Sequence, residues 1–271
     1  MTDTTDMIAS TDANGTSAVV LTEIRGDAGI MTLNRPRVRN ALNLELREAM
    51  QSALESFDAE PSVAVIVLTG AGGNFCSGRD LRAVAAGEPM YSGRPAQLAA
   101  FTRVSVRKPV IAAIEGYALA GGFELALSCD LLVASREAVF GLPEVRRNLV
   151  AIGGGLIRLP QRMPYHLAMQ LVLTGEHVGA RRLAEAGVVT ELAEPGAALE
   201  TALALAERIA ANGPSAVRAS KEIVRRAFEW SGESEAFDAQ LAVAEPALSS
   251  PDREEGVRAF LERRDPVWTD R

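Results

Sequence analysis

The sequence predicts an α/β core followed by a mostly helical C-terminal region. Three short, nearly all-apolar runs, at residues 63–68, 109–114 and 131–134, are typical of strands that are buried on both faces. A glycine-rich turn and a helical run at 123–129 lie between the second and the third of these strands. The order strand, turn, helix, strand is that of a layered α/β fold.

The first elements of the chain are predicted to be a tail and a hairpin. Residues 1–16 are rich in Thr, Asp, Ser and Asn and contain no apolar run, which predicts a disordered tail. Apolar runs at 18–24 and 29–33 flank Arg25-Gly-Asp-Ala-Gly29, and this pattern predicts two antiparallel strands joined by a turn.

Helical spacing of apolar residues predicts the remaining elements. Asn43 is expected to cap a helix whose apolar positions run from Leu46 to Phe57, and Pro61 ends it. After Leu156 helical patterns dominate and glycines separate them. The helices expected there span residues 165–173, 180–186, 197–211, 215–228, 234–244 and 252–264.

Composition excludes several classes of function. The formal net charge of -7 argues against a nucleic-acid or acidic-membrane binder. The two cysteines, Cys76 and Cys129, have neither metal-ligand nor disulfide spacing, which favours a reducing, cytoplasmic setting. His166 and His177 are the only histidines and give little basis for a zinc site or a Ser-His-Asp triad. No apolar run reaches eighteen residues, so no membrane span is expected.

Two glycine-rich turns are candidates for a binding site. The first is Thr69-Gly-Ala-Gly-Gly-Asn-Phe-Cys-Ser-Gly-Arg-Asp-Leu81, and the second is Gly121-Gly122 at the start of a helix. Glycines leave backbone N–H groups accessible, and a helix N-terminus favours an oxyanion. Neither turn has the full dinucleotide-binding pattern. Alone, each turn is more typical of a structural connection.

Two carboxylates accompany these turns. Glu124 lies in the first turn of the helix that follows Gly122, and Glu144 follows Pro143 in a loop. A first-turn glutamate usually stabilises the helix dipole, and a glutamate after proline is usually a solvated loop charge. Taken singly, neither residue indicates catalysis.

Together the segments resemble the crotonase (enoyl-CoA hydratase/isomerase) superfamily. The resemblance rests on both glycine turns, on the spacing of twenty residues between Glu124 and Glu144, and on segments 34–42, 174–180 and 259–264. It implies a spiral of ββα units with a helical C-terminal region. It also implies that the amides of Arg79 and Gly121 hold a thioester carbonyl while the two glutamates carry protons.

The resemblance extends to the substrate, the assembly and the domains. It implies an acyl-CoA substrate with no metal and no separate cofactor, and trimers that often pair into hexamers. The spiral core is expected at 17–200 and a trimerisation region at 201–271. Phe260 and Arg263 would approach the CoA nucleotide of a neighbouring subunit. The residues that would contact CoA are Arg37, Val38, Arg39, Gly78, Asp80, Leu81, Arg82, Gly122, Phe260 and Arg263.

The expected activity is enoyl-CoA hydration, and the departures from the family pattern concern the acyl site. Phe123 stands where a small residue is common and either narrows the site or repacks the helix. The usual Gly-x-x-Pro-Gly stretch reads Asn148-Leu-Val-Ala-Ile152. Met90, Tyr91, Leu98 and Phe101 are candidates for an acyl pocket. The alternatives are a related enoyl-CoA isomerase, a 3-hydroxyacyl-CoA dehydratase, an acyl-CoA hydrolase, or a non-catalytic acyl-CoA- or RNA-binding relative.

Overall fold

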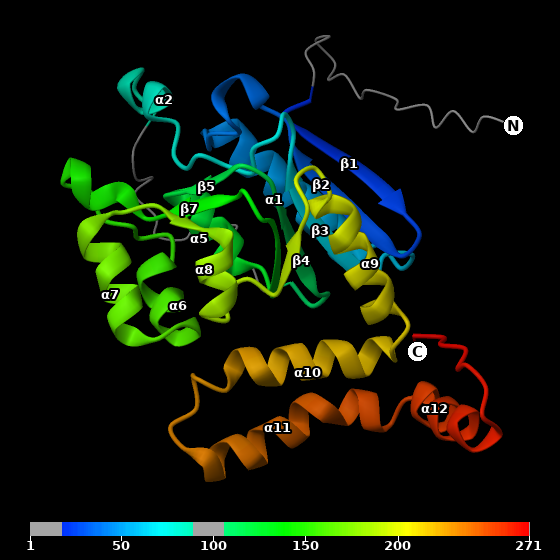
Figure 1. Cartoon of the computed structure of the whole chain (residues 1–271). Helices are drawn as coiled ribbons and strands as arrows, with labels where there is room; N and C mark the ends of the chain where they lie inside the picture. Colours follow the sequence, from blue (N-terminus) through cyan, green and yellow to red (C-terminus); the bar gives the residue numbers. More distant parts are fainter. Residues whose placement is uncertain (1–17, 89–105, 271) are drawn as a thin grey trace, which may run out of the picture.

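A computed structural model describes residues 18–88 and 106–270 of the chain. The expected tail at 1–16 lies outside these residues, and so do the pocket candidates Met90, Tyr91, Leu98 and Phe101. Figure 1 shows a core of strands and helices above a layer formed by the last three helices.

The core is built on a six-stranded sheet with the strand order β1-β2-β3-β4-β6-β9. The first two strands are antiparallel and every later pairing is parallel. This confirms the predicted hairpin and the three predicted buried strands. The strands are β1 (Val20–Arg25), β2 (Ala28–Leu33), β3 (Val65–Gly70), β4 (Val110–Ile114), β6 (Leu131–Ser135) and β9 (Glu191–Ala193).

Both faces of this sheet are covered, as the apolar runs predict. Along β3, Ile66 and Leu68 face one apolar core, and Val65 and Val67 face the other. This alternation follows from the two-residue period of a strand. Helix α1 (Leu44–Ala59) contributes to the first core, and α9 (Ala198–Ala210) covers the second face. All four strand residues are fully buried.

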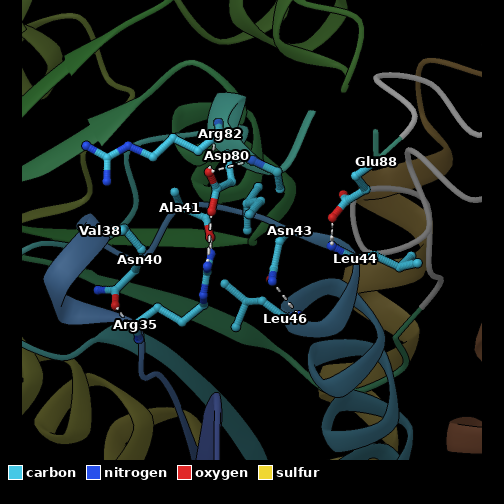
Figure 2. Close-up of polar contacts among 12 residues, drawn as sticks. Arg35, Val38, Asn40, Ala41, Asn43, Leu44, Leu46, Asp80, Arg82 and Glu88 are labelled. Atoms are coloured by element: carbon cyan, nitrogen blue, oxygen red, sulfur yellow. Dashed lines mark hydrogen bonds and ion pairs between the residues drawn. The ribbon is translucent and has the colours of Figure 1, made fainter. Parts of the chain in front are cut away.

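Helix α1 begins where the sequence predicts. The side chain of Asn43 accepts a hydrogen bond from the amide of Leu46 at 3.0 Å, so Asn43 is its N-cap (Figure 2). Leu46, Met50, Leu54 and Phe57 form its buried stripe, which accounts for the apolar spacing in the sequence.

A second, three-stranded sheet was not predicted. It has the order β5-β7-β8 and is formed by β5 (Tyr117–Leu119), β7 (Val139–Gly141) and β8 (Val178–Gly179). These strands are too short to show a periodic pattern. Helix α5 (Gly121–Ser128) follows β5 directly. The remaining helical elements that precede α9 in the sequence are η1 (Pro36–Val38), α2 (Leu81–Ala85), η2 (Pro143–Arg147), α6 (Gly155–Arg162), α7 (Tyr165–Thr174) and α8 (Ala180–Glu185).

Three helices follow α9 and form a separate layer (Figure 1). They are α10 (Pro214–Arg226), α11 (Glu233–Leu248) and α12 (Pro251–Glu262), and they confirm the predicted helical C-terminal region. The expected boundary between residues 200 and 201 falls inside α9, whose buried face belongs to the sheet core. The division into a core and a trimerisation region stays a prediction.

One buried side chain connects the loop before α1 to the turn after β3. The Asn40 amide nitrogen donates to the carbonyl oxygens of Ala71 at 3.0 Å, Asn74 at 2.7 Å and Phe75 at 3.2 Å. Its amide oxygen accepts from the backbone N–H of Arg35 at 2.9 Å. Asn40 is fully buried and has a φ of 56°, a left-handed conformation that asparagine tolerates better than most residues.

We expect Asn40→Asp to destabilise the fold strongly. The change keeps the size of the side chain but directs a carboxylate at three carbonyl oxygens, and an uncompensated buried charge costs about 3–5 kcal/mol. Asn212→Asp is the matched control, because Asn212 also donates to two backbone carbonyls but is exposed. Urea denaturation should show a large decrease in the free energy of unfolding for Asn40→Asp and a small decrease for Asn212→Asp. Equal losses would contradict the role of Asn40.

Candidate active site

The first glycine-rich turn is held against the segment that leads into α5. The amide of Phe75 donates to the carbonyl of Glu115 at 2.8 Å, and that of Cys76 donates to the carbonyl of Tyr117 at 2.9 Å. The amide of Leu119 in turn donates a hydrogen bond to the carbonyl of Cys76 at 3.0 Å. These bonds bring residues that lie about forty positions apart in the sequence into one strand-like pairing.

The two glycine turns therefore meet, as the resemblance implies. A Cβ atom added to Gly78 would lie 2.7 Å from the Cβ of Ala120 and 3.1 Å from the nitrogen of Gly121. A Cβ atom added to Gly121 would lie 3.7 Å from the nitrogen of Arg79. The amides of Arg79 and Gly121 thus belong to adjacent turns. Gly122 is equally constrained, because a Cβ there would lie 2.1 Å from the carbonyl oxygen of Cys76.

Helix α5 begins at the junction of the two turns. The amides of Phe123 and Glu124 donate to the carbonyl of Ala120, at 2.9 and 3.0 Å. The amides of Gly121 and Gly122 precede them, and the first amides of a helix have no carbonyl one turn earlier to bond. The positive end of the helix dipole lies at the same place. This arrangement suits a developing oxyanion.

Glu124 lies in the first turn of α5 with its carboxyl group buried. Only 5% of the residue is exposed, and this burial raises the pKa of Glu124 to about 7. The amides of Gly155 and Gly153 act in the opposite direction by hydrogen bonding, the first at 3.0 Å to Oε1, and the charge of Glu144 raises the pKa further. The carboxyl group of Glu124 therefore titrates near neutral pH.

Glu144 approaches the same place from η2. Its Oε2 atom is buried and has no hydrogen-bond partner within residues 18–88 and 106–270. Burial raises the pKa of Glu144, with its own backbone amide acting in the opposite direction. The charge of Glu144 acts on Glu124, so the two carboxyl groups lie within electrostatic reach of each other. The structure thus brings together both glutamates that the sequence singled out.

Two glycines that the sequence reasoning missed position Glu124. A Cβ on Gly153 would lie 2.6 Å from Oε2 of Glu124, and one on Gly155 would lie 3.0 Å from its Cγ. A side chain at Gly153 would displace the carboxyl group, and one at Gly155 would press on the side chain of Glu124. The run Gly153-Gly-Gly155, directly before a helical pattern, was the available signal.

Several of the expected CoA residues lie beside the first turn. Arg37, Val38 and Arg39 belong to η1 or follow it, and both arginines are exposed. The hydroxyl of Ser77 donates to the carbonyl of Val38 at 3.3 Å, and the amide of Ser77 donates to the carbonyl of Arg39 at 3.0 Å. The Arg39 guanidinium lies 5.0 Å from the ring centre of Tyr117. η1 is thus bonded to the turn that carries Gly78.

Asp80, Leu81 and Arg82 form the start of α2. Asp80 is its N-cap and accepts from the amides of Arg82 at 3.1 Å and Ala83 at 3.3 Å. Its other oxygen lies 3.0 Å from the Arg35 guanidinium (Figure 2). The carboxylate of Asp80 is therefore engaged within the chain, whereas Leu81 and Arg82 are exposed.

Phe260 and Arg263 lie apart from the other candidates within one chain. They belong to the end of α12, which Figure 1 shows at the opposite end of the molecule from α2. Phe260 is 82% exposed. A single chain does not bring them to the two turns.

The departures from the family pattern have distinct structural outcomes. Phe123 is fully buried and packs against Phe140 with ring centres 5.3 Å apart, so it repacks the helix. Asn148 ends η2 in a left-handed conformation with a φ of 53°. Ala151 is buried, and Ile152 is exposed. The cysteines Cys76 and Cys129 are both buried and unpaired.

Two further sequence expectations concern a metal and the membrane. Within the part of the chain that the structure describes, no three His, Cys, Asp or Glu side chains gather so as to hold a metal ion. No helix among the same residues is both long and apolar enough to cross a bilayer.

Comparison with known proteins defines the class of this chain. The family model for enoyl-CoA hydratase/isomerase matches residues 23–271. Enoyl-CoA hydratase EchA19 of Mycobacterium tuberculosis is 40% identical over 257 residues, which cover 93% of this chain and 96% of that protein. Carnitinyl-CoA dehydratase of Salmonella typhimurium is 38% identical over 247 residues, with 89% and 94% covered.

Solved structures agree with these sequence relatives. The crystal structure of an enoyl-CoA hydratase from Mycobacterium tuberculosis H37Rv matches with a TM-score of 0.89 and 48% identity. That match covers 94% of this chain and all of the other. The chain belongs to the enoyl-CoA hydratase/isomerase family and has the crotonase fold. It is an enzyme of the hydro-lyase class.

The buried carboxyl group of Glu124 predicts a pH-dependent stability difference. The pKa of Glu124 is about 7 in the folded protein and near 4.5 in the unfolded chain. The folded protein therefore loses stability as the pH rises from about 4.5 to about 7. We expect Glu124→Gln to be more stable than the parent at pH 8, by about 2 kcal/mol, and similar to it at pH 5. Thermal unfolding at both pH values, with exposed Glu185→Gln as control, measures this. A difference independent of pH would contradict it.

Proposed function

We propose that this chain is an enoyl-CoA hydratase that adds water reversibly to a 2-enoyl-CoA thioester. The observation that carries the proposal is a buried glutamate, Glu124, at the junction of two adjacent backbone-amide turns, with the buried Oε2 atom of Glu144 within electrostatic reach of it. Relatives named enoyl-CoA hydratase and carnitinyl-CoA dehydratase support it, because both names describe gain or loss of water on a CoA thioester.

The amides of Arg79 and Gly121 stabilise the negative charge of the reaction. Attack of water on the β-carbon of an enoyl thioester moves charge onto the thioester oxygen and forms an enolate. Two preorganised N–H donors and a helix dipole lower the free energy of this enolate, and loss of one such donor costs about 10²–10³ in rate.

The two glutamates divide the proton transfers. Burial raises the pKa of Glu124 to about 7 and also raises the pKa of Glu144, so a protonated and an ionised carboxyl group can coexist in the site near neutral pH. The ionised carboxylate accepts a proton from the attacking water, and the protonated carboxyl group delivers one to the α-carbon. Dehydration is the reverse of these steps. Each transfer contributes about 10²–10⁴ to the rate.

The CoA part of the substrate binds along η1 and α2 in this proposal. The exposed Arg37, Arg39 and Arg82 supply positive charge for phosphates, and Val38 and Leu81 supply apolar contact. The reaction needs neither a metal nor a separate cofactor. A cytoplasmic setting is in keeping with two unpaired cysteines.

The first test replaces each glutamate by glutamine. Glu124→Gln and Glu144→Gln keep size and polarity but remove the titratable group, so kcat should fall by about 10² or more for each. The double variant should lose less than the product of the single effects, because both residues act on one water. Loss of enoyl-thioester absorbance over a panel of chain lengths measures the rates.

Controls separate chemistry from folding and from related reactions. Glu185→Gln should keep the parental rate, and calorimetry should show that both active-site variants still bind a saturated acyl-CoA. If the folded parent bound acyl-CoA, hydrated no member of the panel and shifted the double bond of a 3-enoyl-CoA, isomerisation would replace hydration as the function.

The assembly proposed for this chain is a trimer, or a hexamer of paired trimers. None of the residues of α10 or α11 is buried in the single chain. Contiguous exposed apolar surface marks an interface, and obligate oligomers have large apolar interfaces. The exposed apolar residues of the last three helices and their flanking segments are Val224, Phe228, Phe237, Leu241, Leu248, Val257, Phe260, Leu261 and Val267.

Light scattering on the purified chain should therefore report three or six copies. Phe237→Asp with Leu241→Asp places two charges on α11, where both side chains are exposed in one chain, and should give a smaller, folded species. Ile24→Asp, on the exposed side of β1, is the control and should leave the assembly intact. A parent protein that is monomeric at micromolar concentration would exclude this assembly.

A further inference from the structure

Glu88 lies at the junction of α1 and the first glycine-rich turn. One carboxylate oxygen lies 2.5 Å from the Arg79 guanidinium and 3.3 Å from that of Arg47. The other accepts a hydrogen bond from the amide of Leu44 at 3.1 Å, at the first residue of α1 (Figure 2). We propose that Glu88 is a positioning residue that holds the amide of Arg79 in place by fixing the side chain of Arg79.

The three charged side chains of this cluster are mostly buried. Their side-chain exposures are 15% for Arg79, 12% for Arg47 and 17% for Glu88. Two cations therefore approach each other in a region of reduced solvent, and one carboxylate lies between them. Burial lowers the pKa of Arg47 most, and the charge on Arg79 lowers it further, because the two guanidinium groups repel each other. Glu88 and Glu48 act on Arg47 in the opposite direction, so removal of the charge on Glu88 leaves the repulsion less compensated.

The side chain and the amide of Arg79 are coupled through Leu42. The carbonyl of Leu42 accepts from the Arg79 guanidinium at 3.3 Å and from the amide of Asp80 at 3.0 Å. The amide of Leu42 donates to the carbonyl of Gly78 at 2.8 Å. The Arg79 amide lies between these two backbone contacts. A guanidinium that moves away from Arg47 toward solvent therefore pulls on the turn that carries the amide.

This inference rests on the proposed function of the Arg79 amide as an oxyanion donor. A displacement of about 1 Å at a reacting group can cost about 10² in rate. A misplaced donor weakens stabilisation of the enolate more than binding of the thioester. Loss of Glu88 should therefore lower kcat and leave KM nearly unchanged, whereas a residue that only bound CoA would show the reverse.

A double-mutant cycle tests whether Glu88 acts through Arg79. Glu88→Gln keeps the size of the side chain and an acceptor for Leu44 but removes the charge. In the parental background we expect it to lower kcat about 10-fold to 100-fold. In an Arg79→Ala background, where no second guanidinium repels Arg47, the same substitution should change kcat less than about 3-fold. Glu222→Gln on α10, a carboxylate near Arg225 and Arg226, is the matched control.

A second measurement is independent of hydration. Acetoacetyl-CoA has an acidic α-carbon, and its enolate absorbs in the near ultraviolet, so the fraction bound as enolate reports the strength of the two amide donors. Glu88→Gln should lower this fraction in the parental background and not in the Arg79→Ala background. An unchanged enolate fraction, or an equal loss in both backgrounds, would overturn the proposal. A parent that hydrates nothing but binds the enolate would contradict the hydratase assignment alone.

Discussion

The side-chain amide of Asn40 is the contact on which the geometry of the site depends. It satisfies three carbonyl oxygens of the turn after β3, and this turn would otherwise hold buried, unpaired polar groups. The carbonyl of Asn40 also accepts a bond from the thiol of Cys76 at 3.1 Å. β3 can approach this amide only because it ends in glycine, since a Cβ on Gly70 would lie 2.7 Å from the amide nitrogen. The contacts of Asn40 therefore hold the glycine-rich turn that leads to Arg79.

The burial that makes Glu124 useful also destabilises the fold. Its neighbours on α5, Phe123 and Leu125, are fully or almost fully buried in the larger apolar core, so the carboxyl group leaves water when the core forms. Hydrogen bonds from Gly153 and Gly155 offset part of this loss, and the raised pKa reflects the remainder. The same physical effect thus supplies a proton at neutral pH and opposes folding once that proton is lost.

The sequence predicted those parts of the fold that depend on local pattern. Apolar runs located the main strands, and the cap at Asn43 with the apolar spacing after it located α1. Burial and capping both select particular residue types at positions that are close in the sequence. The strand at 178–179 is too short for such a trace, and α6 contains Pro160, which reads as a break. The role of Asn40 was hidden, because its partners lie 31 to 35 positions away.

The site shows the same division between local and distant causes. The family resemblance pointed to Glu124 and Glu144, and the structure places them together, whereas nothing local pointed to Glu88 as a partner of Arg79. Its contacts with Arg47 and Leu44 arise only when α1 packs beside the turn. A glutamate beyond a five-residue helix otherwise resembles a solvated surface charge.

A steric constraint explains why one of the two turns has alanine and the other has glycine where they touch. Ala120 has a φ of 51° and a ψ of -129°, a conformation that strains a residue with a Cβ. Its amide donates to the carbonyl of Gly141 at 2.8 Å, which holds the strained backbone in place. The Cβ of Ala120 fills the space that a side chain at Gly78 would need. Only one of the two turns can carry a side chain at their contact, and glycine on the other lets the amides of Arg79 and Gly121 approach one another.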